Sequence, residues 1–235
     1  MNLNDVDNNA RSRLALALDV DDLVEAGRLG RKMLPWFSVA KVGLELFSAS
    51  GPEAVGAFVD QGYEVFLDLK LHDIPTTVGK ASRVLGSLGV SYVTVHSSGG
   101  VDMLAAAVDG LNEGASAAGL IPPMVLAVTV LTSDLEAPES LLQERLGYAI
   151  EADCGGVVCA ASDLQKVSST APELLSVVPG IRPEGVAAND QGRPATPREA
   201  IKEGAGLLVI GRAVTSSSEP EKAAARIAAE VADAI

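Results

Sequence analysis

The chain has 235 residues, of which 48% are hydrophobic and 3% aromatic, and 18 basic against 31 acidic residues give a net charge of -13. This excess of negative charge disfavours general electrostatic binding to nucleic acid or to an anionic membrane surface, so neither is expected as a partner. A small anionic substrate remains compatible with it, because a few basic side chains in a pocket act over contact distances.

Eight short apolar runs alternate with Ala- and Leu-rich stretches along the chain. This alternation predicts parallel strands joined by helical crossovers, and eight such units in a chain of this length predict an α/β fold of the (β/α)8 TIM-barrel type. An open doubly wound sheet is the alternative. The predicted strands are 14–19, 38–43, 64–69, 91–96, 124–131, 155–160, 174–180 and 206–211, with helices that include 22–34, 52–61, 75–88, 101–118 and 197–203.

Residues 1–235 are predicted to form a single TIM-barrel domain, with 1–12 as a flexible N-terminal extension. The longest irregular stretch, 184–196, follows the seventh strand, where barrel enzymes carry functional loops. No run of about 18 apolar residues predicts a membrane span, and no targeting segment is evident, so a cytoplasmic protein is expected. Cys154 and Cys159 match no zinc or redox motif and are expected to be buried thiols.

The densest group of polar residues lies in FLDLKLHDIPTT, residues 66–77, at the end of the third predicted strand. Asp68 and Lys70 are two residues apart, which places them on one face of a strand and, in a barrel, inside its mouth. Charges are costly to bury there, so the pair indicates a functional site, although a structural ion pair or two solvent-facing charges fit the same spacing. Asp73 precedes Pro75 and either joins this site or caps the next helix.

Two further charges are expected at the same rim of the barrel. Asp19 closes the first predicted strand, although it also fits a cap of the next helix, as do Asp21 and Asp22. Lys41 lies inside the largely apolar stretch SVAKVGLEL near the end of the second strand, so its charge requires a partner or a ligand.

Glycine and arginine residues follow the last two predicted strands. GLLVIGR ends in Gly211 and Arg212, and PGIRP contributes Gly180 and Arg182. Barrel enzymes bind phosphate at this position, where glycine exposes backbone N–H groups and arginine supplies a charged contact. The two strand ends together predict a phosphate site.

The remaining polar candidates carry weaker signals. His72 and His96 are the only histidines, so a metal site built from a histidine cluster is not expected. The chain has no G-x-S-x-G motif, so a serine hydrolase is not expected. Thr129, Thr132 and Ser133 either contact the polar edge of a ring or form an ordinary turn.

From LALD at 16–19 to VIGRAVTSSSEP at 209–220, the chain resembles the orotidine 5′-monophosphate decarboxylase family. The resemblance is carried by LALD, AKVGLELF, FLDLKLHDIPTTV, VTVHSSGG, VTVLTS, GVVC, VPGIRPEG, NDQGR and VIGRAVT. The D-x-K-x-x-D core also occurs in sibling sugar-phosphate lyases that use magnesium and have an acidic ligand where this chain has Lys41. A lysine ammonium cannot coordinate a metal ion, so the resemblance implies a decarboxylase without metal or cofactor.

The resemblance implies that Lys70 donates a proton to the substrate, while Lys41, Asp68 and Asp73 complete a network of alternating charges. It also implies a homodimer with shared active sites, in which Asp73 and Thr77 reach into the neighbouring subunit's site. The remaining implied contacts are to the nucleotide substrate: Asp19 and Lys41 to the ribose, Thr132 to the pyrimidine edge, Gln191 to ring and phosphate, and Arg182, Gly211 and Arg212 to the phosphate.

Two other functions remain open at this point. One is a magnesium-dependent sugar-phosphate decarboxylase or aldolase with the same barrel, against which Lys41 argues. The other is a non-catalytic nucleotide-binding barrel, which would not need so costly a group of charges as Asp68, Lys70 and Asp73.

Overall fold

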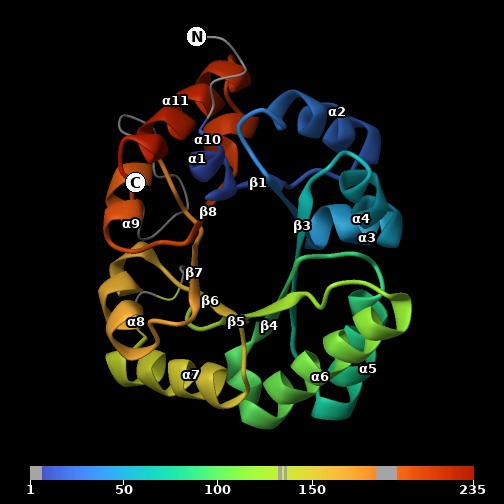
Figure 1. Cartoon of the computed structure of the whole chain (residues 1–235). Helices are drawn as coiled ribbons and strands as arrows, with labels where there is room; N and C mark the ends of the chain where they lie inside the picture. The colour runs from blue at the N-terminus through green and yellow to red at the C-terminus, as the bar shows by residue number, and fades with distance from the viewer. Residues whose placement is uncertain (1–6, 132–133, 135–136, 184–194) are drawn as a thin grey trace.

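The computed structural model describes all residues except 1–6, 132–133, 135–136 and 184–194. Eight parallel strands follow one another around a closed barrel, and the last strand pairs with the first. Helices surround the barrel on its outside (Figure 1). The predicted (β/α)8 architecture is confirmed, and the alternative of an open doubly wound sheet is wrong.

All eight predicted strands are present. The run predicted as 124–131 leaves the sheet after Val128, and the run predicted as 155–160 contributes only three residues. The strands are β1 (Leu14–Leu18), β2 (Val39–Gly43), β3 (Glu64–Leu71), β4 (Tyr92–His96), β5 (Met124–Val128), β6 (Gly156–Val158), β7 (Leu175–Val178) and β8 (Leu207–Ile210).

Helices lie between the strands and at both ends of the chain, and none in the described residues is long and apolar enough to cross a membrane. Asp22 caps α2, because its side chain accepts hydrogen bonds from the N–H groups of Val24 and Glu25. The helices are α1 (Asn8–Ser12), α2 (Leu23–Met33), α3 (Leu44–Ser50), α4 (Pro52–Val59), α5 (Pro75–Gly86), α6 (Gly100–Ala118), α7 (Glu139–Glu151), α8 (Leu164–Thr170), α9 (Pro197–Lys202), α10 (Arg212–Thr215) and α11 (Pro220–Ala232), with 3-10 turns η1 (Ser97–Gly99) and η2 (Ala161–Asp163).

The N-terminal segment differs from the expectation of a flexible extension over 1–12, which is wrong for residues 8–12. These residues form α1, which packs against α11. The side chain of Asp7 accepts a hydrogen bond from the N–H of Asn9, and Ala10 is fully buried. The cap, the burial of Ala10 and a hydrogen bond from the N–H of Ser38 to the carbonyl of Arg11 join this segment to the domain.

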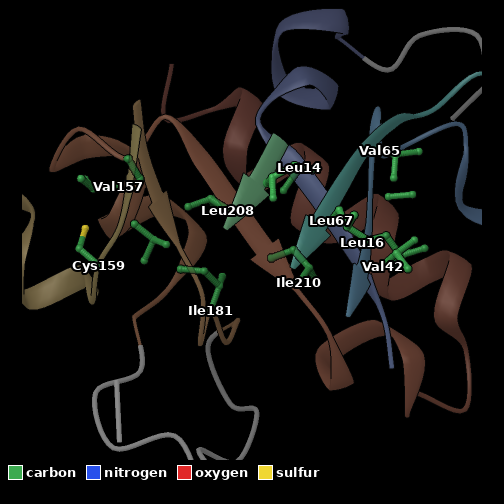
Figure 2. Close-up of a cluster of buried hydrophobic side chains, with 14 of the residues drawn as sticks. Leu14, Leu16, Val42, Val65, Leu67, Val157, Cys159, Ile181, Leu208 and Ile210 are labelled. Carbon is green, nitrogen blue, oxygen red and sulfur yellow. The ribbon is translucent and has the colours of Figure 1, made fainter. Parts of the chain in front are cut away.

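Alternate residues of each strand point into two separate apolar layers. Ala15, Ala17 and Phe66 belong to the layer inside the barrel, with Val39, Leu126, Val177, Leu207 and Val209. Leu14, Leu16, Val42, Val65 and Leu67 belong to the layer between the barrel and its helices, part of which Figure 2 shows. Because both faces are covered, the strands are continuous apolar runs, and a charge on the inner face has protein around it.

Candidate active site

Four charged side chains meet where β1, β2 and β3 end. Lys41 Nζ lies 3.1 Å from Asp19 Oδ1 and 3.5 Å from Asp68 Oδ2. Lys70 Nζ lies 2.7 Å from Asp68 Oδ1. The signs of the charges therefore alternate along the rim in the order Asp19, Lys41, Asp68 and Lys70.

Strand periodicity explains why this cluster points inward. Val39 and Phe66 contact the inner apolar layer, and Lys41 and Asp68 follow each of them by two residues. Lys41 is only 8% exposed, so its ammonium depends on the two carboxylates for stabilisation. The prediction that the charge of Lys41 requires a partner or a ligand is confirmed, because two carboxylates serve as its partners.

The environment of Asp68 keeps it ionised. Burial alone would raise the pKa of this carboxyl group, but the charges of Lys41 and Lys70 and the hydrogen bonds from Lys70 and Thr94 outweigh burial, and the pKa lies below its ordinary value. Asp68 is therefore a fixed negative charge between two ammonium groups at neutral pH.

A cavity of about 160 Å³ opens beside the charge cluster. Lys41, Asp68 and Lys70 form the charged part of its lining and the other lining residues are apolar, so it suits a ring that carries a charged substituent. Its volume is below the roughly 300 Å³ at which small-molecule sites usually begin, so it accounts for only part of a nucleotide site. The other lining residues are Phe66, Val128, Val130, Leu131, Val158, Pro179 and Val209.

Gly211, Arg212 and Arg182, predicted to bind phosphate, follow the neighbouring strands β8 and β7. Gly211 is the N-cap residue of α10 and lies beside Ala17 of β1, and the exposed Arg212 begins that helix. Arg182 is buried, and its guanidinium donates a hydrogen bond to the carbonyl of Ile181 at 2.8 Å. Thr132, Ser133 and Gln191, also predicted to contact the substrate, lie outside the described residues.

Asp73 and Thr77 lie apart from the charge cluster, exposed at the start of α5. Asp73 Oδ1 accepts a hydrogen bond from the N–H of Ile74, and among the described residues Asp73 forms no ion pair with Lys70. The N-cap residue of α5 is Ile74, so the alternative that Asp73 caps this helix is wrong. Within one chain, Asp73 has no catalytic partner that the structure describes.

The histidines and hydroxyls near the rim differ in their surroundings. The rings of His72 and His96 lie 5.6 Å apart, and burial, followed by the charges of His72 and Lys70, lowers the pKa of His96. Thr129 Oγ1 donates to the carbonyl of Val158 in the neighbouring strand β6 at 2.8 Å, so its hydroxyl is engaged by the backbone of another strand and not by a local turn.

One functional candidate was not predicted from the sequence. Thr94 of β4 is fully buried, and its hydroxyl donates to Asp68 Oδ1 at 2.9 Å. A threonine in the strand-forming run YVTVH has an ordinary composition for a strand. Only its position beside Asp68 distinguishes it.

Comparison with known proteins gives a consistent result. The sequence model described as "Orotidine 5'-phosphate decarboxylase / HUMPS family" matches residues 12–227. A curated orotidine 5'-phosphate decarboxylase of Moorella thermoacetica is 42% identical over 235 residues, covering 95% of this chain and 93% of the relative. One of Lactiplantibacillus plantarum is 45% identical over 195 residues, covering 78% and 82%. The crystal structure of orotidine 5'-phosphate decarboxylase from Lactobacillus acidophilus is 33% identical, with a TM-score of 0.80, and covers 94% of this chain and 99% of that one.

Proposed function

The chain belongs to the orotidine 5′-phosphate decarboxylase / HUMPS family, and we propose that it decarboxylates orotidine 5′-monophosphate to uridine 5′-monophosphate with Lys70 as the proton donor. The reaction is the last step of de novo synthesis of pyrimidine nucleotides. It follows from the family and from relatives of 42% and 45% identity that carry this activity in their names. The residue roles below are proposals that rest on the geometry of the barrel mouth.

The chemical problem is the electron pair left on carbon 6 of the pyrimidine when the bond to the carboxylate breaks. No neighbouring group of the ring accepts this pair, so the surroundings must stabilise the negative charge. A preorganised ammonium beside the developing carbanion supplies such stabilisation, of the order of several kcal/mol. The observation that carries the proposal is that Lys70 Nζ is held 2.7 Å from Asp68 and lines the cavity.

Lys70 then completes the reaction. Carbon dioxide leaves, the bond from Nζ to one hydrogen breaks, and that proton joins the electron pair on carbon 6. The neutral amine recovers a proton from water, because the side chain of Lys70 is 32% exposed. Asp68 accepts a hydrogen bond from Lys70 Nζ and so holds the ammonium at the cavity between catalytic cycles.

The rest of the nucleotide extends from the charge cluster toward the ends of β7 and β8. Asp19 is exposed at the rim, so its carboxylate can accept hydrogen bonds from ribose hydroxyls, with Lys41 beside it as a donor. Phosphate is expected at Gly211, Arg212 and Arg182, which follow adjacent strands. Thr132 and Gln191 are proposed for the pyrimidine edge and for ring and phosphate.

A homodimer with shared active sites would give Asp73 and Thr77 a role. Both are exposed beside Ile74, which is 65% exposed, and Leu44 at the start of α3 is 58% exposed. Large apolar side chains in these positions favour burial against another subunit. In the proposed dimer, Asp73 approaches the partner subunit's Lys70 and completes the network of alternating charges.

A magnesium-dependent sugar-phosphate lyase of the same barrel type fits this geometry less well. The ammonium of Lys41 lies between the carboxylates of Asp19 and Asp68, where a cation ligand set would otherwise form. We therefore propose a cofactor-independent reaction. Turnover that persists in metal-stripped protein with excess chelator is the expected result.

The cysteines and the net charge bear on location and partners. Both cysteines, Cys154 and Cys159, are buried, and a large domain with so few cysteines suits a reducing compartment such as the cytoplasm. The net charge of -13 argues against nucleic acid or an anionic membrane as a partner.

The variant Lys70→Ala tests the proposed role of Lys70. We expect turnover to be abolished, as measured by the absorbance of orotidine monophosphate, which should no longer decrease. Uridine monophosphate should still bind in a calorimetric titration. Near-normal decarboxylation by folded Lys70→Ala would show that another group protonates the product.

A further inference from the structure

β3 does not keep a regular register against β4. Phe66 pairs with Tyr92 and Leu67 with Val93, but the next pair is Leu71 with Val95. β3 therefore advances from 67 to 71 while β4 advances only from 93 to 95, and β3 bulges away from the regular ladder. Asp68 and Lys70 both lie inside this bulge.

The bulge places Lys70 in a strained backbone conformation. Its φ angle is +50°, in the left-handed region that favours glycine, and only one other non-glycine residue in the described chain has a positive φ. A residue with a side chain persists in this region only where its surroundings hold it. The group that holds Lys70 therefore also determines where its ammonium lies.

Thr94 provides this hold from the neighbouring strand. The N–H of Lys70 donates to Thr94 Oγ1 at 2.9 Å, which replaces a ladder bond that the irregular register removes. The same hydroxyl donates to Asp68 Oδ1 at 2.9 Å, and Oδ1 also accepts from Lys70 Nζ at 2.7 Å. One buried hydroxyl thus acts both as acceptor and as donor, and closes a ring of hydrogen bonds that runs from the backbone of Lys70 to its ammonium.

We propose that Thr94 is a positioning residue, whose hydroxyl fixes the bulge of β3 so that Asp68 and Lys70 present their charges to the reacting carbon. This inference rests on the proposed role of Lys70 and adds to it. Thr94 does not line the cavity and acts only through Asp68 and Lys70. Removing the hydroxyl while keeping the shape of the side chain should therefore impair turnover more than substrate binding.

The variants Thr94→Val and Thr94→Ser test this proposal in the full-length protein. Valine keeps the shape of threonine without the hydroxyl, and serine keeps the hydroxyl. For Thr94→Val we expect kcat to fall about 10- to 100-fold, the effect of leaving a buried polar group without its partner, with KM within about threefold of wild type. Thr94→Ser should restore kcat to within about threefold of wild type, because the hydrogen-bonded ring can form again.

Ser97→Ala is the matched control. Ser97 follows β4 and is fully buried, and its hydroxyl donates to the carbonyl of Val128 at 2.7 Å, whereas Asp68 and Lys70 bond to Thr94 and to each other. Its loss should lower the melting temperature and leave kcat unchanged. A fall of kcat in Thr94→Val but not in Ser97→Ala separates positioning from a general loss of packing.

Three results would overturn the proposal. Thr94→Val with kcat close to wild type would show that the hydroxyl is not needed, and a Thr94→Ser variant as impaired as Thr94→Val would assign the effect to packing. If Thr94→Val does not fold, Thr94→Ala takes its place, and equal kcat in Thr94→Ala and Thr94→Ser counts against the proposal. Full activity of Lys70→Ala would instead refute the proposed role of Lys70 as the proton donor. If Lys70→Ala is inactive and Thr94→Val has normal activity, the role of Lys70 stands and only the positioning role of Thr94 is refuted.

Discussion

Two halves of the stretch 66–77 differ in how much of their environment the chain itself provides. In the first half, Asp68 and Lys70 lie at the barrel mouth with Lys41 and Thr94 around them. In the second half, Asp73 and Thr77 are exposed at the start of α5, and among the described residues no cation forms an ion pair with the carboxylate of Asp73. One chain therefore holds Lys70 and its counter-charge in place, whereas the role proposed for the outer half would require a second subunit.

The variant Asp68→Ala should have the largest effect, because the loss of this carboxylate from the inner half lowers both the stability of the protein and its activity. It leaves Lys41 and Lys70 without their shared carboxylate, and removing one member of a buried ion pair costs about 3–5 kcal/mol of unfolding free energy. Turnover should also be lost. Urea denaturation and the absorbance assay measure the two effects, and wild-type stability in Asp68→Ala would contradict the buried network.

The variant Asp73→Ala should disrupt activity alone. Because the side chain is exposed, the free energy of unfolding should change by less than about 1 kcal/mol. If Asp73 completes the charge network of the partner's site, kcat/KM should fall by about 100-fold or more, in the range seen when one preorganised electrostatic group is removed. Normal kinetics in Asp73→Ala would remove the outer half from the site.

The free energy of unfolding should depend on pH differently in the wild type and in a variant with an uncharged residue at position 68. The pKa of Asp68 in the folded chain lies below its ordinary value of about 3.9, so its charge stabilises the fold above that pH and ceases to do so as the pH falls through the folded pKa. The difference in unfolding free energy between wild type and Asp68→Asn should therefore shrink between pH 6 and about pH 3. A constant difference across this interval would contradict the lowered pKa.

The smallest effect is expected from Thr77→Ala in the outer half. A single neutral hydrogen bond contributes about 1 kcal/mol, so a lost contact to the partner's substrate should raise KM about fivefold with little change in kcat. Stability should not change, because Thr77 is exposed. Steady-state kinetics measures the effect, and an unchanged KM would exclude Thr77 from substrate binding.

The sequence was sufficient to predict the barrel and the inner half of the site. Alternating apolar runs gave all eight strands, because strands buried on both faces have few polar residues. The same periodicity placed Lys41 and Asp68 on the inner face, two residues after Val39 and Phe66. The bulge in β3 could not be predicted, since nothing in the composition of residues 66–71 distinguishes a regular strand from an irregular one.

For the outer half, Asp73 and Thr77, prediction from the sequence was limited for a different reason. An aspartate ahead of Pro75 resembles a helix cap, but α5 begins after Ile74 and does not use Asp73 as its cap. The role of an exposed carboxylate depends on a neighbouring chain, and spacing within one sequence does not contain that geometry. In the same way, the polar composition of residues 1–12 predicted a flexible extension, and it does not reveal that α1 packs against α11, which lies more than 200 residues away in the sequence.

A mixed dimer of Lys70→Ala and Asp73→Ala chains tests the central claim most directly. The two variants, co-expressed with different affinity tags and purified through both, form dimers in which one site has lost both groups and the other has its own Lys70 and the partner's Asp73 intact. We expect this mixed dimer to recover about half of the wild-type turnover per dimer, although each variant alone is impaired. Recovery no greater than the activity of the two parent variants would contradict a site that is shared between subunits.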